Sequence, residues 1–147
     1  MDIRVQTAAF APGAELDAFT ARQTSAGAVV SFSGVVRDVA GGLLRMEIEH
    51  YPGMTESAIS VMTERAIARF ELTDATVIHR HGALKPGEVI MMVLTAAPHR
   101  KAAFDGAEFL MDYLKSRAPF WKKEVTSAGA TWVASTCEDE AALKEWD

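Results

Sequence analysis

Two lysines, Lys115 and Lys122, are the residues whose type and spacing most suggest chemistry. Pro119 lies between them, and because proline stops a helix, we place Lys115 in the last turn of a helix and Lys122 in the strand that follows. The chain then folds back, so that both side chains can reach one pocket. Neighbouring cations lower each other's pKa, which makes a lysine usable as an acid, base or nucleophile near neutral pH. Spacing alone favours a simpler role, because a lysine at a helix C-terminus interacts favourably with the helix dipole.

His99 and Arg100 form a second candidate site, for an anion. They directly follow Pro98, at the start of the clearest helix that we predict. The first backbone N–H groups of a helix have no partner within it, so they hold phosphate readily. An arginine that donates two hydrogen bonds strengthens such a site. The spacing is equally compatible with two side chains that face water.

Arg37 and two histidines are weaker candidates. Arg37 closes a strand of apolar residues, where its guanidinium can reach the mouth of a cleft. His79 and His81 are two positions apart, so they share one face of a strand and could chelate a metal ion. No third ligand stands at an obvious spacing. We therefore interpret both as ordinary histidines of a sheet and predict no metal site.

The charge of the chain is unevenly distributed. The net charge is −5, yet between His99 and Lys123 six Lys and Arg stand against three acidic residues, a local balance of +3. An acidic protein is a poor general binder of nucleic acid, because such binding depends on neutralising many phosphates. The basic segment suits a small anionic ligand or the carboxylate end of a peptide. Charge alone favours the simpler alternative of a solvated helix face.

The sequence also indicates a cellular compartment. It has no apolar run of the roughly 18 residues that a membrane span needs, and its first residues lack the order of a signal peptide. Its one cysteine, Cys137, cannot form an internal disulfide, and the three acidic residues that follow it disfavour the thiolate. We expect a cytoplasmic protein that does not use cysteine chemistry.

The elements that must position these residues follow from the pattern of apolar residues. A modest helix is expected between Pro12 and Gly27, a second over Met54–Phe70, a third between Pro98 and Pro119, and a frayed helix in the acidic tail from Cys137. Strands are expected at Ile3–Thr7, Gly27–Val36, Leu43–His50, Ala75–His81, Val89–Ala96, Phe120–Thr126 and Thr131–Ser135. The second and third of these strands, joined by Gly41-Gly42, are expected to pair as a hairpin. Residues 1–147 thus form a single α+β domain.

Four segments carry a resemblance to a known family. They are EHYPGMTE (Glu49–Glu56), HRHGALKPGE (His79–Glu88), the pair His99-Arg100, and MDYLKSRAPFWKKE (Met111–Glu124). In this order they resemble the large, catalytic subunit family of molybdopterin synthase. The resemblance extends over roughly residues 27 to 133, and the last segment is long and idiosyncratic.

The resemblance implies a fold, a reaction and partners. The fold would be of the α/β hammerhead type with an antiparallel sheet, and the assembly a homodimer that forms a heterotetramer with a small ubiquitin-like subunit at each end. That sulfur-carrier subunit ends in Gly-Gly with a C-terminal thiocarboxylate. Two such sulfurs convert cyclic pyranopterin monophosphate, the substrate, into the dithiolene of molybdopterin, the product, with no cofactor and no nucleic acid or membrane involved. A non-catalytic module of the same fold that binds an anion or a peptide tail is the alternative.

The resemblance also assigns roles to individual residues. Lys115 matches the key catalytic lysine, which we expect Lys122, Arg37 and Arg100 to make a proton-exchanging group by lowering its pKa. Lys122 matches the second catalytic lysine. The remaining matches are substrate-binding positions: Val35, Val36, Arg37, His99, Arg100, Lys123 and Glu124. The family often has lysine at the position of Val35, so one cation of that corner is absent from this chain.

Overall fold

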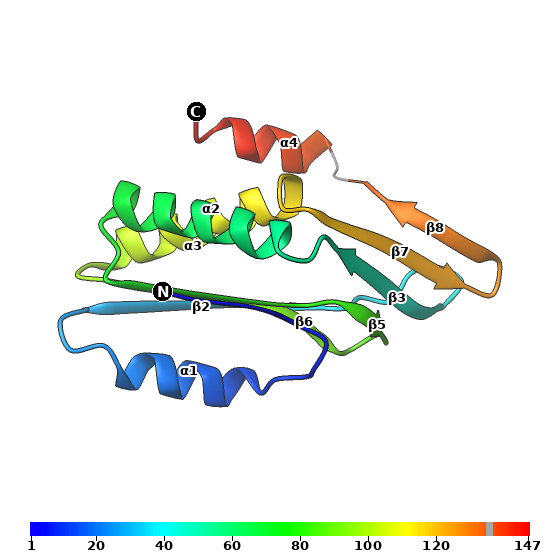
Figure 1. Ribbon diagram of the computed structural model, residues 1–147, viewed down its shortest axis with the longest axis horizontal. Helices are drawn as coiled ribbons and strands as arrows, with labels where there is room; N and C mark the ends of the chain where they lie inside the picture. The colour runs from blue at the N-terminus through cyan, green and yellow to red at the C-terminus, as the bar shows by residue number, and fades with distance from the viewer. Residues whose placement is uncertain (135–136) are drawn as a thin grey trace.

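The computed structural model describes residues 1–134 and 137–147, which form four helices and two four-stranded sheets (Figure 1). The elements are, in chain order, β1 (Asp2–Gln6), α1 (Pro12–Ala21), β2 (Ala28–Val35), β3 (Leu43–His50), α2 (Met54–Phe70), β4 (Asp74–Arg80), β5 (Gly82–Leu84), β6 (Val89–Ala97), α3 (Arg100–Ser116), β7 (Phe120–Thr126), β8 (Gly129–Val133) and α4 (Cys137–Lys144). The predicted α+β class is confirmed. The last predicted strand is displaced toward the N-terminus, and its end at Ser135 lies outside the described residues.

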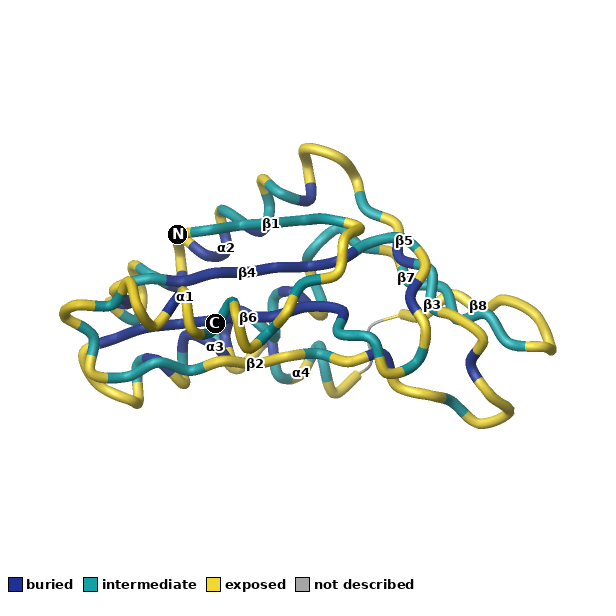
Figure 2. The backbone as a smooth tube through the Cα atoms, turned by 90° about the horizontal axis from the view of Figure 1, so that it is seen from below, coloured by how far each residue is buried: buried dark blue, intermediate teal, exposed yellow. Residues whose placement is uncertain are grey.

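The first sheet has the strand order β1-β4-β6-β2. Strand β6 is almost wholly apolar and all but its first residue is buried, as expected for an interior strand covered on both faces. Figure 2 shows β4 and β6 as the buried middle of this sheet, with β1 and β2 more exposed at its edges. Strand β1 pairs with β4 in parallel, and the other neighbours are antiparallel.

Helices cover both faces of the first sheet: α1 lies on one face, and α2 and α3 lie on the other (Figure 1). The apolar stripe predicted for α3 is buried and includes Ala103, Ala107 and Leu110. Thr95 of β6 donates a hydrogen bond from Oγ1 to the carbonyl of Ala103 at 2.7 Å, which ties the start of this helix to the sheet. Helix α3 is therefore held in a fixed position along the sheet.

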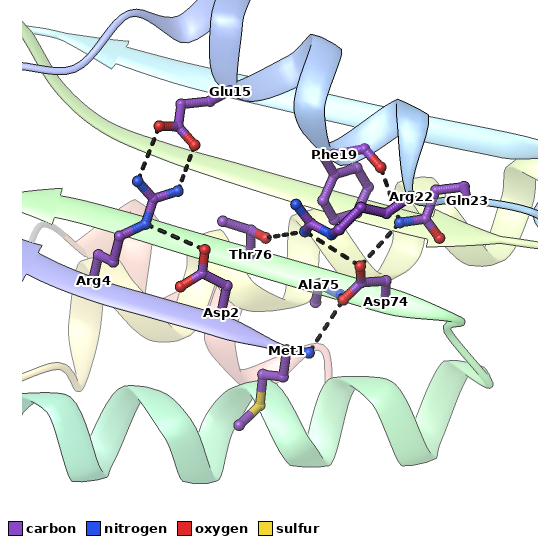
Figure 3. Close-up of polar contacts among 10 residues, drawn as sticks. All are labelled: Met1, Asp2, Arg4, Glu15, Phe19, Arg22, Gln23, Asp74, Ala75 and Thr76. Carbon is purple, nitrogen blue, oxygen red and sulfur yellow. Dashed lines mark hydrogen bonds and ion pairs between the residues drawn. The ribbon is translucent and has the colours of Figure 1, made fainter.

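Helix α1 is held by one buried phenylalanine, Phe19, and by polar contacts to β1 and β4 (Figure 3). Arg4 of β1 forms an ion pair with Glu15 of the helix. Gln23, just after the helix, donates a hydrogen bond from Nε2 to Asp74 at 2.9 Å, and the amino group of Met1 also pairs with Asp74 at 3.2 Å. These contacts lie on the face of the sheet opposite α2 and α3.

The second sheet has the order β5-β3-β7-β8 and corrects the predicted hairpin. Strand β2 pairs along its length with β6 of the first sheet, whereas β3 pairs with β5 and β7 of the second. The residues between β2 and β3 therefore cross from one sheet to the other. Gly41 and Gly42 turn with φ of 88° and 86°, and Asp38 accepts hydrogen bonds on Oδ1 from the backbone N–H groups of Val39 and Leu43.

The acidic tail is a helix that packs on the rest of the molecule. Leu143 of α4 is buried, and Trp146, just beyond the helix, lies against Phe70 and Phe109 with ring centroids 5.5 and 5.6 Å apart. Arg117, directly after α3, binds both carboxylate oxygens of Glu140 at 3.0 Å. Helix α4 is thereby fixed beside the end of α3. Within the part of the chain that the structure describes, no helix is long and apolar enough to cross a membrane.

Candidate functional site

The candidate site is a cavity of about 510 Å³ that both predicted catalytic lysines line, and we call it the main cavity. Its wall is formed by the end of β2, the start of β6, the end of α3 and one face of β7, so both sheets contribute to it. The volume is in the range of cavities that bind small molecules. Apolar side chains, including Met46, Met91 and Met111, line most of it. Its polar groups are Ser33, Arg37, His79, Lys115, Lys122 and Glu124.

The turn between α3 and β7 brings the two predicted catalytic lysines to this cavity. The backbone N–H groups of Arg117 and Ala118 both donate to the carbonyl of Tyr113, which ends the helix, and β7 begins at Phe120. Lys115 is exposed in the last helical turn, and Lys122 lies half-buried on β7. The expectation that the chain folds back and that both lysines reach one pocket is confirmed.

The electrostatic effect of this arrangement falls on Lys122. Burial lowers the pKa of Lys122, and the positive charge of Lys115 lowers it further, while the carboxylate of Asp139 acts in the opposite direction. A lysine whose ammonium is disfavoured exchanges protons nearer to neutral pH than an ordinary lysine does. The sequence argument had assigned this property to Lys115.

Arg37 is positioned by the residue before it. The backbone N–H of Val36 donates to the carbonyl of Glu88 at 2.9 Å, and the N–H of Gly87 donates to the carbonyl of Val36 at 2.8 Å. Gly34 allows the strand to pass close to its neighbour, because a Cβ there would lie 3.0 Å from Cγ of Met91. Arg37 thus leaves a fixed strand end and lines the main cavity together with Val35 and Val36.

Glu124 and Lys123 lie on opposite faces of β7. Glu124 lines the main cavity, as does Lys122 two positions earlier. Lys123 instead lies 3.9 Å from a carboxylate oxygen of Glu47, and its Nζ is 4.7 Å from the ring centroid of Trp132. The structure therefore brings Glu124 to the lysines and does not bring Lys123 to them.

His99 and Arg100 lie at the other end of α3. Helix α3 begins at Arg100, and Lys115 stands in its last turn. At 1.5 Å per residue, the sixteen positions from His99 to Lys115 correspond to about 24 Å. Neither residue lines the main cavity of this chain. The structure therefore does not bring this pair to Arg37, Lys115 and Lys122 within one chain.

Two residues of the site were not assigned to it from the sequence, where His79 was interpreted as an ordinary sheet histidine. His79 of β4 lines the main cavity and is buried, with 3% of its surface exposed. Asp139 of α4 lies with Lys115 and Lys122 around an adjoining pocket of about 270 Å³. The sequence signal for Asp139 was only an acidic run, and that for His79 only a histidine in an apolar strand.

The two histidines have separate surroundings. The His79 ring stacks on Phe120, and the His81 ring lies against His50 at a tilt of 35°, each with centroids 3.9 Å apart. Within residues 1–134 and 137–147, no group of three or more His, Cys, Asp or Glu side chains is arranged to hold a metal ion. The cations that line the main cavity, Arg37, Lys115 and Lys122, are suited to bind an anion.

Comparisons with known proteins agree with this geometry. The sequence model of the family described as MoaE protein matches residues 5–117. A protein of Cereibacter sphaeroides named molybdopterin synthase catalytic subunit is 61% identical over 146 residues, which cover 99% of this chain and all of that protein. A protein of the same name from Pseudomonas aeruginosa is 51% identical, with 100% of this chain and 99% of that protein covered.

A solved structure shares the whole fold. The molybdopterin biosynthesis MoaE protein from Burkholderia ambifaria superimposes with a TM-score of 0.85 at 47% identity, covering 99% of this chain and 97% of that one. This chain is thus similar to these proteins along its full length. The similar region includes Arg37, Lys115 and Lys122 and the fold that brings them together. The chain belongs to the MoaE protein family.

Proposed function

We propose that this chain is the catalytic subunit of molybdopterin synthase. In this role it transfers sulfur from the C-terminal thiocarboxylate of a small partner subunit to cyclic pyranopterin monophosphate. The observation that carries the proposal is the convergence of Arg37, Lys115 and Lys122 from three elements on one largely apolar cavity. Membership of the MoaE family and 61% identity to a protein named molybdopterin synthase catalytic subunit support it.

The reaction needs positive charge and a movable proton, and the main cavity offers both. The sulfur of the partner forms a bond to a carbon of the pterin side chain as a carbon–oxygen bond at that carbon breaks, and the oxygen departs as water or on the opened phosphate. The terminal carbonyl of the partner is then attached through sulfur. Water then adds to this carbonyl and the carbon–sulfur bond to it breaks, which leaves sulfur on the pterin and a carboxylate on the partner. An oxyanion develops at the carbonyl, and cations around it stabilise that charge.

We assign these tasks to different lysines. Lys122, whose pKa is lowered by burial and by Lys115, moves the proton. Lys115, exposed at the end of α3, supplies fixed positive charge at the carbonyl. Arg37 binds an anionic group of the substrate or of the partner's tail, with Val35, Val36 and Glu124 as the neighbouring wall.

The proposal includes a second copy of the chain. His99 and Arg100 can hold the phosphate of the substrate only if they come from a partner copy, because α3 separates them from Lys115 by its own length. We propose a homodimer in which each copy brings this pair to the cavity of the other, and a heterotetramer once two small subunits bind. Lys123 points away from the main cavity, so we propose that it binds at a contact outside this cavity.

We propose a cytoplasmic location and no cofactor. The single cysteine, Cys137, is free and exposed, which suits a reducing compartment. It stands among acidic residues that disfavour a thiolate, so sulfur has to arrive on another protein. The acidic net charge supports a small-molecule substrate over nucleic acid.

The deciding experiment is a reconstituted assay. The purified chain is mixed with cyclic pyranopterin monophosphate and a thiocarboxylated small subunit, and the dithiolene product is measured. Product is expected with the complete mixture, and none when the small subunit carries an ordinary carboxylate. Tight binding of both molecules without product would favour the alternative, a non-catalytic binding module. Equal turnover with inorganic sulfide and no small subunit would rule out sulfur delivery by a carrier protein.

A further inference from the structure

The imidazole of His79 is a buried part of the wall of the main cavity. It belongs to β4, in the middle of the molecule, and 3% of its surface is exposed. One face of the ring stacks on Phe120 of β7 with centroids 3.9 Å apart and an interplanar angle of 20°. The stack joins the two sheets directly beside Lys122, which lies two positions after Phe120 on the same strand.

The hydrogen bonds of this ring fix its tautomer. Nδ1 lies 2.8 Å from the carbonyl oxygen of Arg80. A carbonyl oxygen only accepts hydrogen bonds, so Nδ1 carries the proton and Nε2 is an unprotonated acceptor. Burial and the positive charge of Lys122 lower the pKa of His79 to about 3, so the ring stays neutral at physiological pH.

Nε2 has no partner among the described residues. The buried side-chain nitrogen and oxygen atoms without a hydrogen bond, within that part of the chain, are Arg4 Nε and Ser116 Oγ. Nε2 of His79 is not one of these two atoms, so it is accessible from the main cavity that His79 lines. In the free protein, water can donate to an acceptor in this position. A ligand that displaces this water loses free energy unless it offers a donor of its own.

We propose that His79 binds the substrate by accepting a hydrogen bond on Nε2 from an N–H group of the heterocycle. The inference rests on the proposed function, since a pterin carries ring N–H and amino donors. It divides the main cavity into a cationic side, formed by Arg37, Lys115 and Lys122, and an acceptor side at His79. The anionic end of the substrate then lies at the cations, and its donor edge lies at the β4 wall.

The first test measures the imidazole itself and requires no turnover. In protein labelled with ¹⁵N-histidine, the His79 ring should show one protonated and one unprotonated nitrogen at pH 7. Cyclic pyranopterin monophosphate should shift the unprotonated Nε2 resonance toward the protonated type, as hydrogen bonding does. Inorganic phosphate alone should bind the cations and leave Nε2 unchanged. A saturating amount of the pterin that leaves Nε2 unchanged overturns the inference.

The second test separates binding from structural support by comparing three variants. His79→Asn keeps a donor for the Arg80 carbonyl and removes the Nε2 acceptor, so the KM for the pterin should rise roughly 3- to 10-fold, the loss of one net hydrogen bond. His79→Gln can place an acceptor near the Nε2 position and should restore the KM to about twofold of wild type. His81→Asn is the matched control, because His81 also contacts a ring but does not line the main cavity.

The outcomes are distinguishable from failure of the proposed function. If the wild-type chain makes no dithiolene in the complete assay, the proposed function fails. The NMR measurement of the His79 ring nitrogens still reports on pterin binding in that case. If wild type is active and His79→Asn has an unchanged KM for the pterin, only the role of His79 is overturned. Equal losses in the Asn and Gln variants, with equal falls in melting temperature, would mean that the ring only supports the wall. The KM for the small subunit should stay unchanged in all three variants.

Discussion

Lys122 and Lys115 are adjacent in the main cavity but differ in surroundings. Lys122 is half-buried on β7 and Lys115 is exposed at the end of α3. The charge of Lys115 is one of the two causes that lower the pKa of Lys122. Substitution of Lys115 should therefore change the pKa of Lys122, and this change can be measured.

The first prediction is that Lys115→Ala raises the pKa of Lys122. Removing a like charge makes the ammonium of Lys122 less unfavourable, so the pKa moves back toward its ordinary value while the contribution of burial remains. NMR of protein with ¹³C-labelled lysine side chains, titrated between pH 7 and 11, measures this directly. Lys123→Ala is the control, because Lys123 lies on the other face of β7. An unchanged pKa in Lys115→Ala would show that the two lysines do not interact.

The second prediction compares arginine at the two positions. Lys122→Arg should lose activity by about 100-fold or more, because guanidinium keeps its charge and cannot release a proton near neutral pH. Lys115→Arg should retain a substantial part of the activity, since a fixed charge is sufficient there. Alanine at either position should remove nearly all activity. Single-turnover rates of product formation make the comparison, and the reverse order of the two arginine variants would exchange the roles that we assign.

The third prediction concerns stability toward acid. The folded state holds the pKa of His79 at about 3, whereas the unfolded chain has the ordinary value near 6.5. Between these values the unfolded state binds the additional proton, so stability is fully present above pH 6.5 and falls as the pH decreases, by up to about 1.4 kcal/mol per pH unit. His79→Phe keeps the stack and should flatten the dependence in this window. Urea unfolding of both proteins at pH 7.5, 6 and 5 measures how the free energy of unfolding depends on pH. The same dependence in wild type and in His79→Phe would contradict the assignment.

At the scale of single residues, the sequence was sufficient to predict the cations of the site but not the hydrogen-bond acceptor that we assign to His79. Lys115, Lys122 and Arg37 are recognisable because they lie at element ends, where the chain reverses. His79 lies inside an apolar strand, where its type and spacing match those of an ordinary sheet histidine. Its bond to the Arg80 carbonyl and its stack on Phe120 depend on packing between the two sheets, which is not visible in local sequence.

At the scale of elements, the residues just after α4 are attached to α2 and α3 through one aromatic side chain. Trp146 packs against Phe70 and Phe109, donates from Nε1 to Asp112 at 2.6 Å, and accepts on its carbonyl from Arg69 at 2.7 Å. Figure 1 shows α4 lying over these helices, away from the first sheet. The attachment keeps Asp139 beside Lys115 and Lys122.

The fourth prediction is that Trp146→Ala lowers the free energy of unfolding by about 2 kcal/mol, which is less than for a fully buried tryptophan. Trp121→Ala is the matched control, because Trp121 is 47% exposed on the outer face of β7, and should cost about 0.5 kcal/mol. Chemical denaturation of both variants gives the comparison. Equal losses would mean that the tail contributes no more than the surface does.

Prediction of the elements succeeded where the signal was local. The apolar periodicity of α2 and α3 was sufficient to place both helices, and the apolar run of β6 identified an interior strand. The hairpin failed because a Gly-Gly turn shows that the chain bends and not which strand becomes the neighbour. Strand β2 pairs with β6, where Ala28 is opposite Ala97, and no local signal connects residues that far apart. The three residues of β5 were too few to detect.

At the scale of the whole molecule, α3 separates two parts of the proposed site. Lys115 lies at one end of this helix and Arg100 at the other. In the homodimer that we propose, a second copy of the chain brings Arg100 to the cavity that holds Lys115. Under this proposal, dimerisation is a condition of activity and not only of stability.

The fifth prediction is that two inactive variants restore activity when mixed. Lys115→Ala and Arg100→Ala chains, unfolded and refolded together in equal amounts, should regain about a quarter of wild-type activity, because one site in four then has both residues intact. Each variant refolded alone should stay inactive, and light scattering should give the mass of a dimer. No recovery in a mixture that does form dimers would mean that Arg100 acts in its own chain.

The position of β6 also determines when this protein can begin to fold during synthesis. Strand β6 is the neighbour of both β4 and β2, yet it comes after most of the other strands, at Val89–Ala97. A nascent chain that ends before Val89 can pair β1 with β4, but it lacks the strand that joins β4 to β2. On the ribosome, β2 and one edge of β4 must therefore wait in an unpaired state that favours association with chaperones. Chain closure between distant segments also makes folding slow compared with a helical bundle of this length.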